Sequence, residues 1–315
     1  MLFDEFTFWI FFWIIVIILF FVDLYVTDHR RGKITLKASL IWSGVWIVTA
    51  LLFNVFIYFY LQDGHQKAIE FLTGYIVEKS LSVDNLFVFL LIFKFMGITN
   101  ENQPHVLKWG IISAIVFRII FILAGVGLIK LFHPVIYIFG LILLYAAYKM
   151  AFGGEYKVDL EKNPLTKFAS RHFKLKTDYK GKKFFVKDAG KRFATPVFLT
   201  FLLIESSDIV FAVDSIPAII AITHDTFIII SSNIFAILGL RALYFALAGI
   251  VDLFRYLKYG VALVLFYVGI KMMISDLYKI PTEISLAVIL SVLTFTVFLS
   301  VAENKILKRK DSKKK

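Results

Sequence analysis

The sequence predicts an all-α fold, a polytopic membrane helix bundle of about nine spans. The chain of 315 residues is 59% hydrophobic and 18% charged, with a mean hydropathy of +0.80, which is outside the range of soluble domains. Apolar runs of roughly twenty residues, enough to cross about 30 Å of hydrocarbon, recur along the chain. They cover residues 6–26, 39–60, 72–96, 108–131, 133–151, 195–222, 226–249, 256–277 and 283–301.

Basic residues predict the topology. Lys and Arg concentrate at 30–37, 149–192 and 305–315, whereas the connections near 61–71 and 223–225 are nearly neutral. By the positive-inside rule the basic segments are cytoplasmic, which places the N-terminus outside and the C-terminus in the cytoplasm. The first run lacks a small-residue cleavage site, so we expect a retained helix in the inner or plasma membrane and no signal peptide.

Composition also limits the function. The formal charge of +12 lies in connections and a tail, where it favours contact with anionic lipid of the bilayer, and we expect no nucleic-acid partner. The chain has no Cys, and its His residues fall in loops or at segment ends, so a metal site inside the membrane must use oxygen ligands. We find no nucleophile with a base and no cofactor motif, so we expect neither an enzyme nor an organic cofactor.

Two parts of the chain resemble each other in order. The segment "FLTGYIVE" at 71–78 matches "FLTFLLIE" at 198–205, and further pairs at similar offsets are Ser82–Phe87 with Ser206–Phe211, Arg118 with Arg241, and Tyr145/Lys149 with Tyr267/Lys271. Each copy would hold three spans, an odd number, so the second copy enters the membrane from the opposite side. This predicts two three-helix inverted repeats, as in secondary transporters with a site near the bilayer midplane.

The predicted organisation follows from these repeats. It consists of two N-terminal spans at 1–60, a first repeat at 71–151, a basic cytoplasmic loop at 152–192, a second repeat at 195–277, and a last span with a basic tail at 283–315. We assign no chemistry to the loop.

Five acids fall at membrane depth, where each charge costs about 2.5–3.5 kcal/mol. They are Glu78, Asp84, Glu205, Asp208 and Asp214. Arg118 and Arg241 are the expected charge-compensating residues, and Lys79 either joins them or snorkels to the interface. The acids are in excess in both cases, and uncompensated carboxylates take up protons or bind a divalent cation. The alternative is ion pairs that lock helices together, which we favour for the two arginines.

The donor set limits the choice of metal. Carboxylates without Cys, His or Met favour Mg²⁺, Ca²⁺ or Mn²⁺ and disfavour copper and zinc. Asn85 and Ser206 are candidate additional metal ligands, as are Ser207, Ser215 and Asn233, although Asn and Ser in membrane helices also serve as hydrogen-bond partners between helices. Because Pro217 cannot donate to the carbonyl of Val213, we expect the sixth span to be kinked or broken between about Ile209 and Pro217, which would bring Asp214 into the site.

Three segments resemble the TerC family of integral membrane proteins. They are "EKSLSVDNLFVF" (78–89), "ESSDIVFAVDSIPAIIAIT" (205–223) and "SSNIFAILGLRALYF" (231–245). The resemblance implies a cell-membrane protein grouped with lysine-exporter-like transporters and associated with Mn²⁺ efflux and tellurium resistance, in which the five acids matter for transport. Only the resemblance selects Mn²⁺ among the hard cations.

We therefore expect a secondary transporter that exports a hard divalent cation, with Mn²⁺ as its transported substrate and protons as the counter-ion. Ca²⁺/H⁺ exchange is a variant of this hypothesis. The alternative from another class is a membrane assembly or metal-delivery factor that works with partner proteins. The sequence does not indicate an oligomeric state.

Overall fold

The computed structural model describes residues 5–26, 35–132, 134–152, 174–175, 181–188, 191–250, 256–274, 276–278 and 280–312. The helices are α1 (Glu5–Phe21), the π-helix η1 (Val22–Val26), α2 (Leu36–Tyr60), α3 (Gly64–Phe95), α4 (Gln103–Leu131), α5 (Val135–Phe152), α7 (Pro196–Ile220), α8 (Thr226–Ile237), α9 (Leu240–Ile250), α10 (Leu257–Met273) and α11 (Thr282–Ser312). The strands are β1 (Lys174–Leu175), β2 (Phe185–Asp188) and β3 (Lys191–Ala194). The predicted all-α membrane fold is confirmed.

Several helices are suited to cross a membrane. Four are long and apolar enough within the described residues, at Thr7–Tyr25, Leu36–Tyr60, Gln103–Ile129 and Glu283–Glu303, and α8 with α9 makes a fifth that is bent by 44°. Helices α3 and α7, with 32 and 25 residues, also reach the necessary length, whereas α5 and α10 are shorter, with 18 and 17 residues. The chain is a multi-pass membrane protein, and the number of nine spans stays a prediction.

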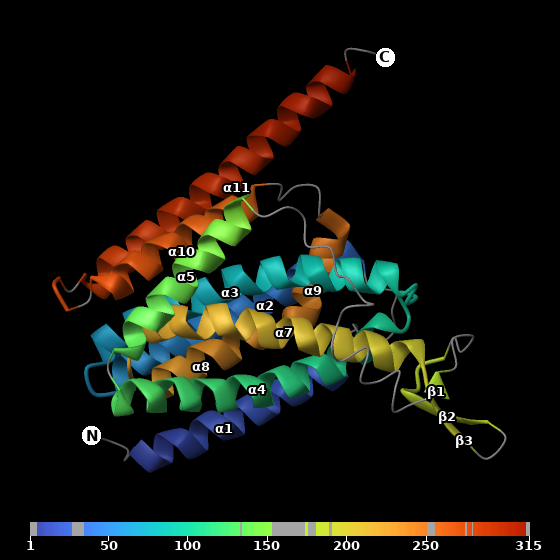
Figure 1. The fold of residues 1–315 in the computed structure, drawn as a ribbon, viewed down its shortest axis with the longest axis horizontal. Coiled ribbons are helices and arrows are strands. Elements are labelled where there is room, and N and C mark those ends of the chain that lie inside the picture. Colours follow the sequence, from blue (N-terminus) through green and yellow to red (C-terminus); the bar gives the residue numbers. More distant parts are fainter. Residues whose placement is uncertain are drawn as a thin grey trace.

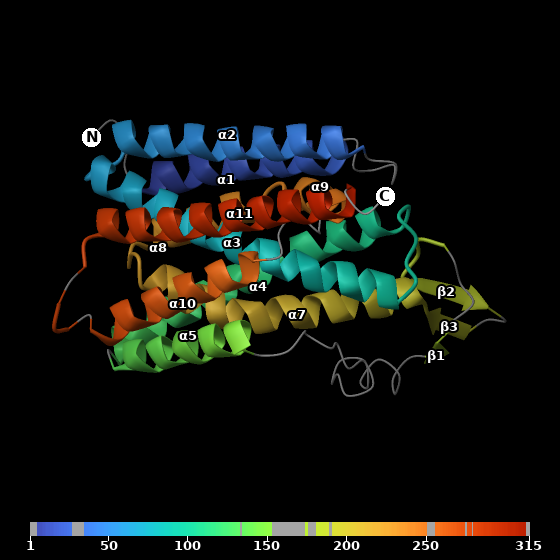
Figure 2. The ribbon, with the colours of Figure 1, turned by 90° about the horizontal axis from the view of Figure 1, so that it is seen from above.

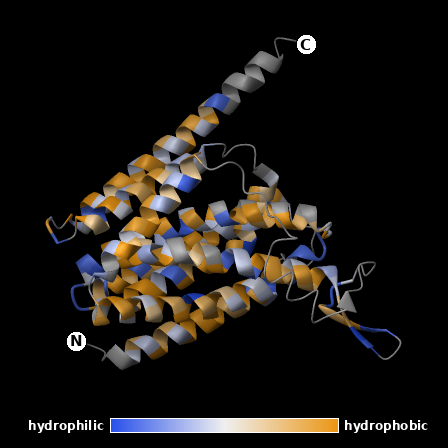
Figure 3. Ribbon diagram, in the orientation of Figure 1, coloured by the Kyte–Doolittle hydropathy of each residue, from blue (hydrophilic) through white to orange (hydrophobic). Residues whose placement is uncertain are grey.

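The helices form a bundle with an apolar outer surface. Helices α1 and α2 lie at one edge, α5 and α10 lie at the opposite edge, and α3 and α7 lie between them (Figure 2). Helix α11 projects beyond the bundle at its C-terminal end (Figure 1). Hydrophobic residues dominate the outer helices (Figure 3), and large side chains such as Leu52 and Phe59 are exposed there. This outward face is the one expected to meet lipid.

The helix contacts follow a reciprocal pattern. Helix α3 packs on α8, α4 packs on α7, and α5 packs closely on α10. A Cβ atom added to Gly140 of α5 would lie 3.3 Å from the carbonyl oxygen of Gly269 in α10, and one added to Gly269 would lie 3.2 Å from the carbonyl oxygen of Gly140. A two-fold relation between the repeats would produce these contacts, and the inverted repeat itself stays a prediction.

The seventh predicted span is not one continuous helix. Helix α8 ends at Ile237 and α9 begins at Leu240, and Gly239 between them has a φ of +77°. A Cβ atom on Gly239 would lie 2.3 Å from Cδ1 of Trp46 in α2, so only glycine fits. The Lys79 ammonium donates to the carbonyl oxygens of Ala236 and Leu238 at 3.0 and 3.3 Å. It therefore satisfies backbone groups that the break frees and complements the negative end of α8.

The predicted break in the sixth span is wrong. Helix α7 runs unbroken from Pro196 to Ile220 with Pro217 inside it. The carbonyl of Pro217 accepts from the amide of Ala221 at 3.0 Å, so hydrogen bonding resumes within a turn. A full break would expose further unpaired backbone groups in an apolar setting, which costs more than the single bond that Pro217 cannot make.

The loop at 152–192 contains structure that the sequence analysis did not predict. The strands form a small sheet in the order β1-β3-β2, with β2 and β3 antiparallel and Phe185 opposite Ala194. Phe184 packs its ring against His105 and Trp109 of α4 and Phe201 of α7, so the sheet is fixed to the ends of two helices. Residues 153–173, 176–180 and 189–190 of the loop lie outside the described residues.

The break at Gly239 allows a stability test. We expect Gly239→Ala to lower stability by about 1–3 kcal/mol, because alanine resists a positive φ and its methyl group would overlap Trp46. Thermal unfolding followed by tryptophan fluorescence in detergent measures the loss. Gly127→Ala in α4 is the control, since a Cβ atom there meets nothing within 4 Å. Equal melting temperatures for the two variants would contradict the assignment.

Candidate functional site

Arg118 of α4 is the centre of a buried polar network. Its side chain is 2% exposed, and it forms an ion pair with Glu78 of α3, which is fully buried. A second pair joins Nη2 of Arg118 to Asp208 of α7 at 3.9 Å. Nη1 also donates to Asn233 of α8 at 3.0 Å and to Ser215 of α7 at 3.4 Å. One side chain therefore connects four helices.

The small polar residues considered as metal ligands mostly have other partners. Ser215 and Asn233 accept hydrogen bonds from Arg118, as above. The hydroxyls of Ser206 and Ser207 both donate to the carbonyl of Leu203 at 2.9 Å. Asn85 is buried in α3. Hydrogen bonding is thus the role that the structure gives to Ser215 and Asn233, and the ligand roles of Asn85 and Ser206 stay predictions.

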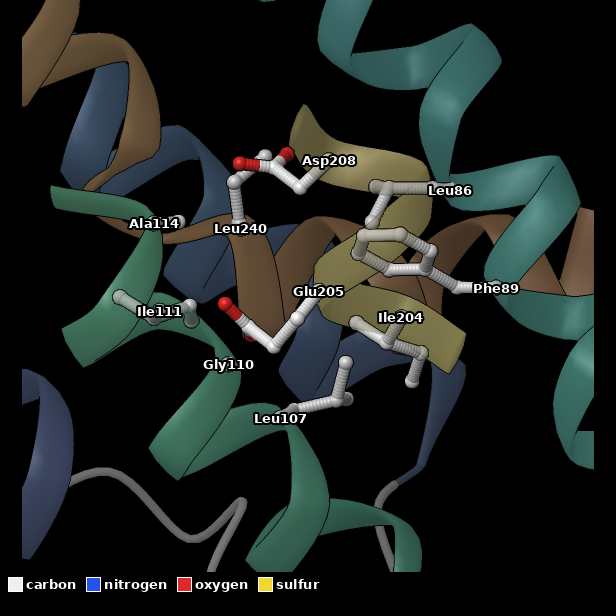
Figure 4. Close-up of a pocket in the computed structure, with 10 residues that line it drawn as sticks. All are labelled: Leu86, Phe89, Leu107, Gly110, Ile111, Ala114, Ile204, Glu205, Asp208 and Leu240. Carbon is white, nitrogen blue, oxygen red and sulfur yellow. The ribbon is translucent and has the colours of Figure 1, made fainter. Parts of the chain in front are cut away.

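Glu205 of α7 points into a cavity of about 20 Å³ between α3, α4, α7 and α9, enough for one water molecule or one ion. Figure 4 shows its carboxylate directed towards Gly110 of α4. The side chain is 5% exposed, and neither carboxylate oxygen has a hydrogen-bond partner in the described part of the chain. Ser113 lies beside the Glu205 side chain, but its hydroxyl donates to the carbonyls of Trp109 and Gly110 at 2.8 and 3.2 Å and not to the carboxylate.

Gly110 gives the carboxylate its space. A Cβ atom there would lie 3.4 Å from Oε1 of Glu205, so any larger side chain would enter the cavity. Asp208 lines the same cavity one helical turn beyond Glu205. The cavity is otherwise apolar, with Leu86, Phe89, Leu107, Ile111, Ala114, Ile204 and Leu240 in its walls. Arg118 lies 3.9 Å from Asp208, and no described cation pairs with Glu205. A buried carboxylate without a cation takes up a proton or binds a cation.

Asp84 and Asp214 belong to described helices, but their side chains lie outside those that the structure describes. Asp214 lies nine residues beyond Glu205 on the continuous helix α7, about 180° around its axis and about 13 Å along it. Because α7 is not broken, Asp214 is not brought next to Glu205 as we expected. Among described side chains, no group of three or more acids or histidines lies close enough to hold a metal.

A second buried ion pair was missed by the sequence analysis. Nε of Arg241 in α9 donates to Asp23 of η1 at 2.9 Å, and the two side chains are 2% and 1% exposed. Lys79 lies near Asp23 and Glu78, and its ammonium is held within the bundle by the carbonyl oxygens of Ala236 and Leu238. Arg241 compensates a charge, as expected, but its partner comes from the first span. The position of Asp23 inside the apolar run at 6–26 could have indicated this ion pair.

Comparison with known proteins agrees with this architecture. The model of the integral membrane protein TerC family matches residues 63–310. The chain belongs to the TerC family. Relatives named "Putative membrane-bound redox modulator Alx" are 42% identical in Escherichia coli K12 and 41% identical in Salmonella typhi, covering 92% of this chain and 93% and 92% of theirs. An uncharacterized membrane protein of Rickettsia bellii is 40% identical, covering 96% of this chain and 99% of its own. No solved structure matches the chain.

The network around Arg118 allows a second test in this TerC protein. We expect Arg118→Met to destabilise the protein by about 3–5 kcal/mol, because Glu78 would be left as a buried charge without a partner. Thermal unfolding of the purified protein measures this loss. The double variant Arg118→Met/Glu78→Gln should lose less than the sum of the single variants.

Lys108→Met is the control on the same helix, because Lys108 is half-buried at the edge of the bundle, where its ammonium contacts Tyr25. Its effect should stay within about 0.5 kcal/mol. Additive losses for Arg118→Met and Glu78→Gln would show that the two side chains do not depend on each other.

Proposed function

We propose that this protein is a secondary transporter that exports Mn²⁺ from the cytoplasm, using the acids of the Glu205 cavity as its binding site. The observation that carries the proposal is Glu205, a buried carboxylate that faces an ion-sized cavity beside Asp208 and has no hydrogen-bond partner among the described side chains. Buried carboxylates are retained in membranes chiefly where they bind ions or protons.

The roles of the acids differ in this proposal. Glu78 is held by Arg118 and supports the site, whereas Glu205 and Asp208 are the ligands nearest to the cavity. Asp84 and Asp214 are further predicted ligands. Carboxylate oxygens suit Mg²⁺, Ca²⁺ and Mn²⁺, and the family resemblance favours Mn²⁺. The same carboxylates can hold protons when the metal leaves, which makes metal/proton exchange the natural coupling.

The names of the relatives suggest a second candidate, modulation of redox state. This chain contains no Cys, so its own thiols cannot carry such a role. Transport of Mn²⁺, a redox-active metal, would be consistent both with such a name and with a site whose charged groups are carboxylates. The assembly or metal-delivery factor is the remaining alternative, and it requires a partner that the transporter does not.

Flux through the purified protein tests the proposal. Reconstituted into liposomes without any partner, the wild type should move Mn²⁺. We expect Glu205→Gln to reduce this flux by at least about tenfold, equivalent to losing ~1.4 kcal/mol of binding, because the amide removes a charged ligand but keeps the shape. Glu283→Gln, an exposed residue at the start of α11, should behave as the wild type. Absence of wild-type flux would favour the partner-dependent alternative.

Ion competition and an imposed pH gradient test selectivity and coupling. We expect Ca²⁺ to compete with Mn²⁺ more strongly than Mg²⁺ does, since Mg²⁺ gives up its water shell reluctantly. A proton gradient directed against the metal movement should accelerate Mn²⁺ flux in the same liposomes, with a dye for internal pH reporting the counter-flow. Flux that ignores the gradient would remove proton exchange from the proposal.

A further inference from the structure

The two buried arginines have unlike partners. Arg118 pairs with Glu78 of α3 and reaches Asp208 of α7. Arg241 pairs with Asp23, which belongs to η1 in the first span and therefore lies outside both predicted repeats. Each of these pairs is buried, so each arginine needs its anion in order to stay inside the bundle.

The two arginines occupy equivalent positions in the predicted repeats, so equivalent partners are expected for them. Arg118 corresponds to Arg241, and Glu78 corresponds to Glu205, so the counterpart of the Arg118–Glu78 pair would join Arg241 to Glu205. The structure instead holds Arg241 on Asp23, and the Glu205 oxygens have no hydrogen-bond partner within the described part of the bundle. Leu240, which precedes Arg241, lines the Glu205 cavity. The backbone of Arg241 therefore lies next to the cavity wall, although its side chain does not line the cavity.

We propose that Asp23 is a positioning residue that holds Arg241 away from Glu205 and so keeps the Glu205 carboxylate open to the metal. This inference rests on the proposed function. If Asp23 loses its charge, Arg241 becomes a buried cation with one anion fewer, and the Glu205 carboxylate, which forms no ion pair with a described side chain, becomes a partner for it. A guanidinium on Glu205 then competes with the metal for the same oxygens.

Lys79, the other cation near Asp23, has hydrogen-bond acceptors of its own. The Lys79 ammonium is held by two carbonyl oxygens at the end of α8. The loss of Asp23 therefore releases Arg241 more than Lys79. The same geometry gives Arg241 two alternative anions, one in the first span and one in the cavity, so the arginine could also neutralise Glu205 after the metal has left.

The test compares Mn²⁺ binding by purified wild type, Asp23→Asn, Asp23→Asn/Arg241→Gln and Asp23→Glu, using isothermal titration calorimetry. We expect Asp23→Asn to weaken binding by at least about tenfold, which corresponds to ~1.4 kcal/mol. The double variant should return to within about threefold of the wild type, because the competing guanidinium is gone. Asp23→Glu should bind as the wild type, because it keeps the anion. Unchanged binding by Asp23→Asn would overturn the inference.

The double variant also protects the test against a folding failure. It removes one charge of each sign and should fold even if Asp23→Asn does not. Wild-type affinity in the double variant supports the inference, whereas a tenfold loss there overturns it, because Asp23 and Arg241 would then be needed for the fold or the site itself.

A metal-independent measurement separates this inference from the proposed function. Dicyclohexylcarbodiimide couples to carboxyl groups in apolar surroundings that no cation holds, and mass spectrometry locates the adduct. We expect Glu205 to be labelled in the wild type and in the double variant and protected in Asp23→Asn. This pattern without Mn²⁺ binding in any variant would refute the proposed function and leave the positioning role of Asp23 supported. Equal labelling in all variants would refute that role.

Discussion

Arg118 needs the acids around it, because an arginine at membrane depth without an anion costs several kcal/mol. That requirement fixes the relative positions of α3, α4, α7 and α8, each of which supplies a group to the network. It also divides the acids into two classes. Glu78 is neutralised by the network, whereas Glu205, on the same helix as Asp208, is left facing the cavity. The stability of the bundle and the openness of the site therefore have one origin.

Most of the fold could be predicted from local patterns in the sequence. Run length and apolar composition predicted the helices, because each span must satisfy its own backbone within the membrane. Most helix ends lie within about five residues of the predicted ones, but α3 begins eight residues earlier and α11 ends eleven residues later. The acids and Arg118 were predicted since a charge in an apolar run is costly and visible. Asp23 was not, although it lies in such a run, because its partner depends on how η1 packs on α9.

The position of the helix break shows where local rules fail. Proline is the usual indicator, yet α7 passes through Pro217, because the surrounding hydrogen bonds persist. The break occurs at Gly239, where Trp46 from α2 occupies the space of a side chain. Lys79 donates to the carbonyl oxygen of Ala236, which lies 157 residues later in the chain and is freed by the break. Contacts over such separations depend on the assembled bundle, so the sequence pattern of α8 and α9 does not reveal them.

The size of the cavity would limit how an ion binds in the proposed transport site. About 20 Å³ holds one ion or one water molecule, so a cation with its complete hydration shell does not fit between Glu205 and Gly110. On the proposed function, an entering ion would therefore have to exchange water for carboxylate oxygens. This exchange would disfavour Mg²⁺, which keeps its waters, relative to larger hard cations. A cavity of this size, with carboxylates as its charged groups, would thus select by dehydration cost as well as by charge.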